Sequence, residues 1–510
     1  MQPSHLLSVQ DALAGKRILI TGVTGFLGKA VVEKLLRQVT DIGQIVLLIR
    51  KGRFDSAEQR CEEDVFSSSI FDRLRQQQGA DFWKGKVSVV DGELTQRRFG
   101  LSQDAFDDLG QQLDMIINSA ASVNFREALD QALSINTLCL NNLCALSSVK
   151  GVGEQATPVV QISTCYVNGF NRGFMREEVV APASGLIPKL DDDLYDIEPL
   201  LAKMQEKIQT IYDKKLNPQK AEQALIRLGI EQARKYGWND TYTFTKWLGE
   251  QLLLKYFDRR NLSIVRPSII EGTWSEPVKG WVEGVKVADA MIYAYAKGRV
   301  SVFPGDDRGV LDVIPVDLVA NAVILTAAQR MEQQDQYRIY QCCSGRTNPI
   351  QLRDFISLIQ EESIANYRQY PKLFAGKPQE RFRTVNLSRF RLYMTAFKTQ
   401  TWFATLVGRI LGSKVAKQKM LKAKTTAELA QIFGFYTAPK YRFDSFQLEQ
   451  LMAHFKREDR VMFDVQADQF DWPTYVQKVH MPGLHHYALQ NKAERKAERD
   501  GKLVSIKKAA

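Results

Sequence analysis

A glycine-rich turn between an apolar strand and a helix constrains this chain most. Residues 16–21 contain a short apolar run, typical of a strand buried in a parallel sheet, and residues 29–37 show helical spacing. Between them, Gly22 permits a tight turn, Gly25 lets backbone amides approach a diphosphate, and Gly28 lets the helix pack close to the strand. The helix N-terminus adds oriented N–H groups and partial positive charge. We therefore expect a dinucleotide site.

The end of the second strand indicates which dinucleotide binds. Residues 44–50 are a second apolar run, and sites for NAD usually end this strand with Asp or Glu, which hydrogen-bonds the ribose 2′-hydroxyl. Here Arg50, Lys51 and Arg53 stand instead, and Asp55 comes later in the loop. A guanidinium and an ammonium suit a 2′-phosphate. We predict NADPH; the alternative is a solvated basic loop.

Length and composition set the class of protein. A chain of 510 residues with 45% apolar residues predicts a globular protein of two or more domains. Its six cysteines show neither metal-ligand spacing nor a secreted framework, and no signal peptide or spanning segment is indicated, so we expect a cytoplasmic protein. The net charge of +11 suits an anionic ligand or an acidic protein or membrane surface. Peripheral membrane contact is therefore possible, and no nucleic-acid motif is present.

Strand and helix patterns alternate through the first third of the chain. The expected strands after the second are residues 87–91, 113–121, 159–164 and 262–267, and residues 125–148 are expected to be helical, with Asn136 among them. The small residues that end the run 113–121 let a cofactor pass over them. This alternation predicts an α/β fold, a Rossmann-type doubly wound parallel sheet that binds ligands at the carboxyl ends of its strands.

The sequence also suggests a division into domains. Residues 1–349 form the expected NADPH-binding reductase domain, with an insertion at about 171–240 that carries a helical run over 200–236. An insertion of that size is usually functional, often as a lid or substrate wall. Residues 350–490 are mostly helical, basic and aromatic and are expected to form a smaller second domain, followed by a charged tail at 491–510.

A second motif carries the chemistry. Tyr242 and Lys246 lie four residues apart and share one face of an expected helix. A lysine ammonium beside a phenol lowers the tyrosine pKa toward working pH, so that the pair can donate a proton to a carbonyl oxygen. Thr164, or its neighbour Ser163, at a strand end could hydrogen-bond the same oxygen. A Tyr/Lys pair alone is often a surface pair; after a nucleotide turn, it favours a reductase.

These residues resemble the extended short-chain dehydrogenase/reductase superfamily, and more finely the fatty acyl-CoA reductases of the male-sterility type. The resemblance covers roughly residues 15–345 and rests on residues 21–29, 120–125, 162–168, 242–246, 265–268 and 312–317. A looser match follows in the expected helical domain, at residues 441–445, 460–464 and 470–475. This pairing of domains distinguishes the family from sugar-nucleotide epimerases.

The resemblance implies NADPH-dependent reduction of a long-chain fatty acyl thioester through the aldehyde to the primary alcohol. In that reaction, Tyr242 protonates the substrate oxygen and Lys246 steadies the nicotinamide ribose. Three points stay open at this stage: CoA or acyl-carrier protein as the acyl carrier, release of the aldehyde, and the oligomeric state. The alternatives are an enzyme acting on a nucleotide-sugar and a non-catalytic NADP-sensing protein.

The expected site combines catalytic and cofactor-binding residues. Catalysis is assigned to Ser163, Thr164, Tyr242 and Lys246. Cofactor contacts are expected from Gly22, Thr24, Gly25, Phe26, Leu27, Gly28, Arg50, Lys51, Glu93, Ala120, Tyr242, Lys246 and Pro267. Glu93 stands where the family usually has Asp, and could reach the adenine amine in competition with Asp91; Asn118 stands where relatives often have His. No metal is expected, because His485 and His486 lack a third ligand.

A basic amphipathic stretch at residues 398–424 has several possible roles. Its apolar residues and flanking lysines could cover an acyl channel, receive the phosphates of CoA, or rest on an anionic membrane surface. The alternative is a core-facing helix with a solvated basic rim.

Overall fold

Seven parallel strands form the centre of the molecule, which was analysed as a computed structural model. The structure describes residues 6–286, 288–296, 302–333, 337–378, 383–386, 388–390 and 434–489, with isolated positions between 392 and 399. The strands are β1 (Arg17–Thr21), β2 (Gln44–Ile49), β3 (Val87–Asp91), β4 (Met115–Asn118), β5 (Val159–Ile162), β7 (Leu262–Pro267) and β12 (Arg338–Cys342). Their order in the sheet is β3-β2-β1-β4-β5-β7-β12. The order reverses between β1 and β4, which makes their carboxyl ends a topological switch point. The predicted doubly wound sheet is confirmed.

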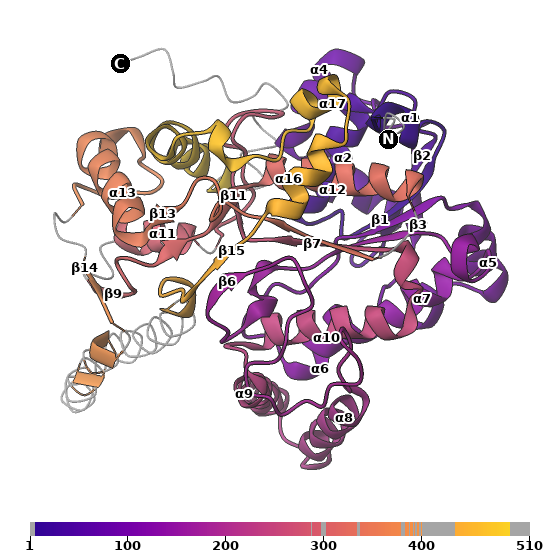
Figure 1. The fold of residues 1–510 in the computed structure, drawn as a ribbon. Helices are drawn as coiled ribbons and strands as arrows, with labels where there is room; N and C mark the ends of the chain where they lie inside the picture. The colour runs from indigo at the N-terminus through magenta and orange to yellow at the C-terminus, as the bar shows by residue number, and fades with distance from the viewer. Residues whose placement is uncertain are drawn as a thin grey trace, which may run out of the picture.

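Alternating side chains of the strands fill two separate hydrophobic layers. In β1, Ile18 and Ile20 belong to one buried cluster, whereas Leu19 between them belongs to the other. The first cluster is covered by α1 (Val9–Leu13), α2 (Phe26–Gln38), α12 (Val316–Glu332) and α16 (Phe446–Ala453). The second is covered by α5 (Gln103–Gln112), α6 (Leu129–Leu133), α7 (Leu140–Ser147) and α10 (Thr241–Tyr256). Figure 1 shows α2, α12 and α16 above the sheet and α6, α7 and α10 below it.

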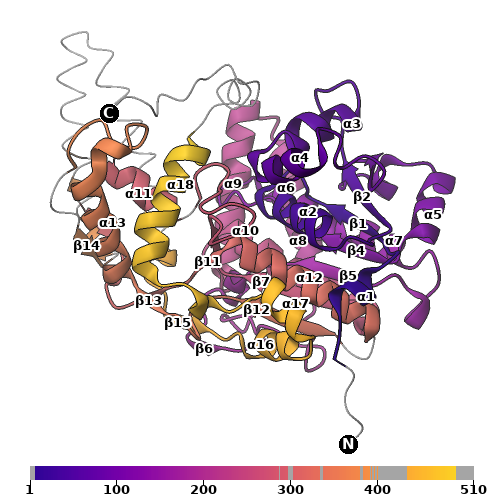
Figure 2. The same cartoon turned by 90° about the horizontal axis from the view of Figure 1, so that it is seen from above.

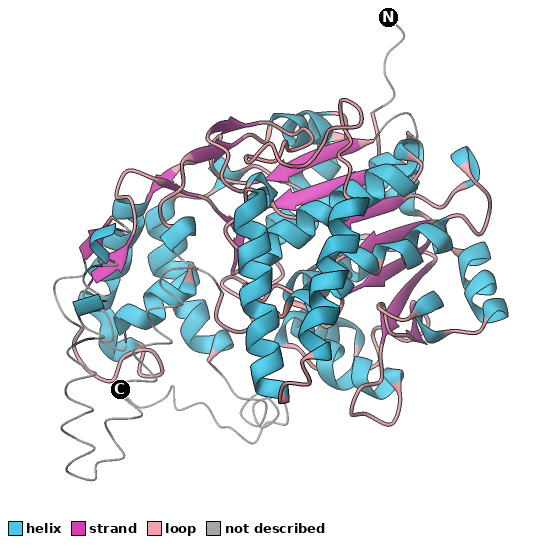
Figure 3. Ribbon diagram, turned by 90° about the horizontal axis from the view of Figure 1, so that it is seen from below, coloured by secondary structure: helices cyan, strands magenta, loops and turns pink. Residues whose placement is uncertain are grey.

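Two of the expected helices are interrupted. The helix expected over residues 125–148 begins only at Leu129, and a π-helical turn, Ser134–Leu138, separates α6 from α7. The run expected over 200–236 is two helices, α8 (Glu198–Asp213) and α9 (Pro218–Tyr236). Pro218 starts α9 because its fixed φ suits the first position of a helix. Figure 3 shows the helices of this side in front of the strands, seen from below.

The C-terminal elements pair with strands of the first 349 residues. Strand β15 (Tyr441–Phe443) lies parallel to β6 (Gly173–Met175), and β13 (Ile350–Gln351) lies antiparallel to β10 (Val310–Leu311). The strand β14 (Arg383–Val385) lies parallel to β9 (Val302–Pro304). The remaining elements of this part are helical: α13 (Leu352–Asn366), α17 (Arg457–Met462), α18 (Met481–Gly483) and the π-helical turns Thr474–His480 and Leu484–Ala488. Figure 2 shows α13 and α18 beside α11 (Asp289–Ala296), at the opposite end from α5.

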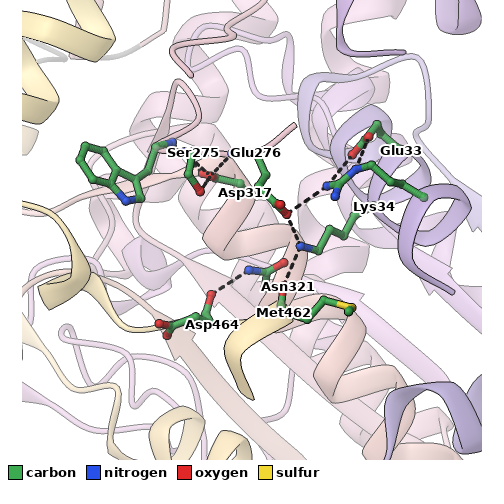
Figure 4. A network of polar contacts seen from close by, with 10 residues as sticks. Glu33, Lys34, Ser275, Glu276, Asp317, Asn321, Met462 and Asp464 are labelled. Carbon is green, nitrogen blue, oxygen red and sulfur yellow. Dashed lines mark hydrogen bonds and ion pairs between the residues drawn. The ribbon is translucent and has the colours of Figure 1, made fainter. Parts of the chain in front are cut away.

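A partly buried polar network joins α2, α12 and the C-terminal part (Figure 4). The carboxylate of Asp317, in the first turn of α12, accepts three backbone N–H bonds of 2.8 to 3.0 Å, donated by Trp274, Ser275 and Glu276. The side chain of Glu276 pairs with Lys34 of α2 at 2.6 Å, and Lys34 Nζ also donates to the carbonyl of Met462 at 2.7 Å. Three segments distant in sequence are thus held by one group of contacts.

Candidate active site

The glycines of the turn have the geometry that the sequence predicts. Gly22 has a φ of +70°, and a Cβ there would lie 2.5 Å from the backbone nitrogen of Ala120, so the turn lies directly against the loop after β4. A Cβ at Gly28 would lie 2.6 Å from the carbonyl oxygen of Gly22, so α2 packs on the turn without room for a side chain. Gly25 is the N-cap of α2, and no side chain caps the first N–H groups of this helix. These groups can receive a phosphate.

The side chains of the same turn have different surroundings. Thr24 lines a small cavity at the carboxyl ends of β1 and β2. Leu27 is buried in the core, so only its backbone faces the turn. Phe26 stacks on Trp281, with ring centroids 4.9 Å apart, and Lys286 Nζ lies 4.1 Å from the centre of the Phe26 ring. The loop that carries Trp281 and Lys286 therefore lies against the start of α2.

Two adjoining cavities follow the end of β2. Their volumes are about 840 and 140 Å³, and both are lined by Arg50, Arg60 and Glu93. Lys51 and Asp91 line the larger one, and the Lys51 backbone N–H donates to Asp91 at 2.9 Å. Glu93, expected at the adenine amine, pairs with Arg50 at 2.8 Å. Arg60 was not expected here: it donates to the Arg50 carbonyl at 2.7 Å, and nothing in its local sequence marks this contact.

Helix α10 presents the Tyr/Lys pair to the ends of β5 and β7. Lys246 is buried, and its Nζ donates to the carbonyl of Ile162 at 2.6 Å. Thr164 lies two residues after Ile162. Its hydroxyl accepts the Tyr166 N–H at 3.2 Å and donates to the Pro267 carbonyl at 3.4 Å. The Thr164 side chain also lies close enough to the Tyr242 hydroxyl to lower its pKa. The structure therefore brings Thr164, Tyr242, Lys246 and Pro267 together.

The pKa values of the pair correct one expectation. Burial, and next the charge of Asp240, raise the pKa of Tyr242 well above its usual value, and the hydrogen bond with Thr164 lowers it by less. Lys246 is not among the causes of this shift, so the expected lowering of the tyrosine pKa by the lysine is wrong for the protein alone. Burial lowers the pKa of Lys246 to about 8, although the charge of Glu250 opposes this shift. Tyr242 is therefore a neutral phenol across the physiological range.

Two further polar residues differ in their contacts. Ser163 is buried, and its hydroxyl has no hydrogen-bond partner among the described residues. Asn136, within the π-helical turn, hydrogen-bonds both the N–H and the carbonyl of Ser122 at 2.9 and 3.1 Å and donates to Thr245 at 3.0 Å. It therefore fixes the loop after β4 relative to α10. The sequence places Asn136 on a helix but gives no sign of this role.

A tyrosine from the C-terminal part hydrogen-bonds the residue that caps the start of α10. Asp240 is the N-cap of this helix and accepts the Thr243 N–H at 2.9 Å. Its second oxygen accepts the hydroxyl of Tyr436 at 2.8 Å. The ring of Tyr436 contacts Phe125, whose ring in turn contacts Tyr242 edge to face, with centroid distances of 5.1 and 5.7 Å. Aromatic side chains thus surround the catalytic candidate on one side.

A buried cluster connects β8 (Ile269–Glu271) with the C-terminal part. His480 Nε2 lies 2.7 Å from Asp289 and 3.8 Å from Glu271. The three side chains offer atoms within 4.8 Å of one another, a spacing that could hold a metal ion. Burial and the charge of Asp289 raise the pKa of Glu271 well above its usual value. In the sequence, the neighbouring His485 and His486 are the visible histidine pair, because a short-range pattern cannot bring His480 to residues 271 and 289.

Comparison with known proteins identifies the family. Models described as male sterility protein match residues 20–323 and 397–491. Fatty acyl-CoA reductase 2, chloroplastic, of Arabidopsis thaliana is 30% identical over 512 residues, which cover 96% of this chain and 80% of that protein. The alcohol-forming fatty acyl-CoA reductase of Simmondsia chinensis is 30% identical over 499 residues, which cover 94% of this chain and 99% of that protein. The chain belongs to the fatty acyl-CoA reductase family.

This reductase is accordingly an oxidoreductase with a nicotinamide dinucleotide as its cofactor. Its fold resembles the terminal R domain from the myxalamid PKS-NRPS biosynthetic pathway, with a TM-score of 0.56, 17% identity, and coverage of 93% of this chain and 91% of that one. Among its described helices, none has the length and apolar character needed to cross a membrane. The basic stretch 398–424 lies outside the described residues apart from Thr399, and so does the tail 491–510.

Proposed function

We propose that this reductase uses NADPH to reduce a long-chain fatty acyl-CoA to the aldehyde and then to the primary alcohol. The observation that carries the proposal is the position of Tyr242 and Lys246 on α10, where Lys246 Nζ donates to the carbonyl of Ile162 at the end of β5 and the Thr164 side chain lies beside Tyr242. The name of the Simmondsia chinensis relative, which is alcohol-forming, supports the second reduction. Arg50 and Lys51 at the end of β2 support NADPH, because they suit a 2′-phosphate.

The residues of the site can perform the proton transfers that this reaction needs. NADPH, held at the turn by Gly22, Gly25 and Gly28, would supply a hydride to the thioester carbon, and the carbonyl electron pair would move to oxygen. Thr164 orients this oxygen, and Tyr242 donates its hydroxyl proton to it, a step that a neutral phenol can perform. The resulting hemithioacetal breaks its C–S bond, which releases the thiol and leaves the aldehyde. After Tyr242 has regained a proton from solvent, a second NADPH would supply a second hydride, and a second proton from Tyr242 would give the alcohol.

A single substitution tests the acid. Tyr242→Phe should lower kcat about 10²- to 10⁴-fold, because it removes a positioned proton donor, while the Kd for NADPH stays unchanged. The matched control is Tyr256→Phe on the same helix, whose hydroxyl contacts Glu198 at the exposed surface. Activity is followed as loss of NADPH absorbance with palmitoyl-CoA, and gas chromatography separates aldehyde from alcohol. Full activity of Tyr242→Phe would contradict the assignment.

The same assay tests the cofactor. NADPH should give a higher kcat/KM than NADH, because the cations after β2 meet a 2′-phosphate only in NADPH. Equal values for the two cofactors would contradict this part of the proposal. If aldehyde is the only product and added aldehyde is not reduced, the enzyme catalyses only the first reduction, from thioester to aldehyde.

A further inference from the structure

A large cavity lies beside the start of α10 and shares no lining residue with the two cavities near β2. Its volume is about 920 Å³, within the range of sites for small molecules. Asn239, next to the N-cap of α10, lines it together with Gly169 and Gly305. The strand pairs β6–β15 and β9–β14, whose ends border it, both lie in the left half of Figure 1.

The cavity is strongly basic. Five cationic side chains from separate segments line it, against two acidic ones, which gives a net formal charge of +3. The cations are Arg172, Arg234, Arg308, Arg389 and Lys440, and the acids are Asp306 and Asp307. All five cations are exposed, and among the described residues no carboxylate pairs with any of them. Arginine and lysine gathered in this way suit a ligand with several phosphate groups.

A row of aromatic rings leads from this cavity to the catalytic tyrosine. Phe435 lines the cavity, and its ring lies 5.3 Å from that of Tyr436. Tyr436 contacts Phe125 at 5.1 Å, and Phe125 contacts Tyr242 at 5.7 Å. Three successive ring contacts therefore connect the basic cavity with the candidate proton donor, through Tyr436, which is buried, and Phe125, which is partly buried.

We propose that this cavity binds the phosphorylated nucleotide of coenzyme A, with the thioester arm directed toward Tyr242. The inference rests on the proposed function, in which the substrate is an acyl-CoA. Coenzyme A has a 3′-phosphate and a diphosphate at the end remote from its thiol, which matches the basic cavity at one end of these ring contacts and the proton donor at the other. A concave site favours this nucleotide over the acidic surface of a carrier protein. The site differs from the basic stretch 398–424 that the sequence suggested for the same phosphates.

Substitutions that remove charge test the assignment. The double variant Arg172→Gln/Arg308→Gln should raise the KM for palmitoyl-CoA at least tenfold and leave kcat and the KM for NADPH unchanged. The KM for palmitoyl-pantetheine, a thioester without the nucleotide, should not change. Arg234→Gln should act in the same direction, whereas its control Arg227→Gln should have no effect. Arg227 lies two turns earlier on α9, is exposed and does not line the cavity.

A binding measurement gives a readout without turnover. Calorimetry with adenosine 3′,5′-bisphosphate, performed on the full chain saturated with NADP⁺ so that the dinucleotide site is filled, should show one site. The double variant should lose this site, and circular dichroism should show that it is folded.

The outcomes separate the inference from the function on which it rests. An unchanged KM for palmitoyl-CoA, or bisphosphate binding retained by the double variant, would overturn the inference and leave the proposed function intact. If the double variant has a raised KM for a palmitoyl thioester of acyl-carrier protein but an unchanged KM for palmitoyl-CoA, the inference is overturned. The cavity would then be a surface for the carrier protein. If the chain reduces no acyl thioester, the proposed function fails, and the loss or retention of bisphosphate binding still decides whether the cavity holds the nucleotide.

Discussion

Tyr242 and Lys246 occupy one helix face, and burial shifts their pKa values in opposite directions. It raises the pKa of the phenol and lowers that of the ammonium, because desolvation disfavours the charged form of each group. The tyrosine therefore keeps its proton, which suits an acid. The lysine loses its charge within an accessible pH range, and in the proposed reaction this charge steadies the ribose of the cofactor.

The pKa of Lys246 predicts a pH dependence of activity. Since the pKa is lowered to about 8, the ammonium is present below that pH and is lost as the pH rises through it. We expect kcat/KM to fall above pH 8 and to approach a tenfold loss per pH unit, as for a single essential group. The profile is measured at saturating NADPH, and Lys246→Met should be slow at every pH. A flat profile up to pH 10 would contradict an essential charge at this position.

At the scale of elements, the unit β1–turn–α2 positions the backbone groups for the dinucleotide. The uncapped N–H groups of α2 depend on how closely the helix approaches the turn, and Gly28 sets this approach. The contact is with backbone atoms, Gly22 O at 2.6 Å and Val23 Cα at 2.8 Å, so no side chain can move aside to admit a Cβ.

Gly28→Ala should therefore weaken NADPH binding. A methyl group must push α2 away from the turn, and overpacking of this kind costs about 1–3 kcal/mol. We expect the Kd for NADPH, measured by fluorescence titration, to rise at least about tenfold. Gly376→Ala is the control, because a Cβ there meets no atom within 4 Å. Wild-type affinity in Gly28→Ala would show that the turn tolerates a shifted helix.

Local patterns predicted the elements and the glycine turn but not the contacts that close the site. Continuous apolar runs mark β1 and β2 because parallel strands are buried on both faces. Tyr436 reaches Asp240 across 196 positions, and no periodicity connects them. The π-helical turn at Asn136 depends on its contacts with Ser122 and α10, which a helical pattern does not contain. The direction of the tyrosine pKa shift likewise depends on burial, which spacing alone does not reveal.

At the scale of the whole molecule, the network of Figure 4 fastens the C-terminal part to the nucleotide-binding part. Asp317 is central to it because it is buried and accepts backbone N–H groups from the loop that carries Glu276. Burial raises the pKa of this carboxyl group, and the three hydrogen bonds oppose the rise. Without this carboxylate, three backbone N–H groups of the loop would lose their acceptor.

Asp317→Ala should destabilise the protein. A buried donor left without a partner costs about 1–3 kcal/mol, so we expect the free energy of unfolding to fall by at least about 2 kcal/mol. Asp317→Asn keeps one acceptor oxygen and should cost less, and the exposed Asp468→Ala should change the value by less than about 0.5 kcal/mol. Urea denaturation followed by circular dichroism measures all three. Equal losses for Asp317→Ala and Asp317→Asn would contradict the role of the accepted N–H bonds.

The bond between Tyr436 and Asp240 limits how this reductase can be recombined with its relatives. A chimera that exchanges the segment after residue 433 also replaces the partner of the N-cap on the helix that bears Tyr242. Grafts intended to alter acyl-chain selectivity should therefore transfer the hydroxyl at 436 and the carboxylate at 240 as one unit, since a hybrid that keeps only one of them alters the start of the helix that bears Tyr242.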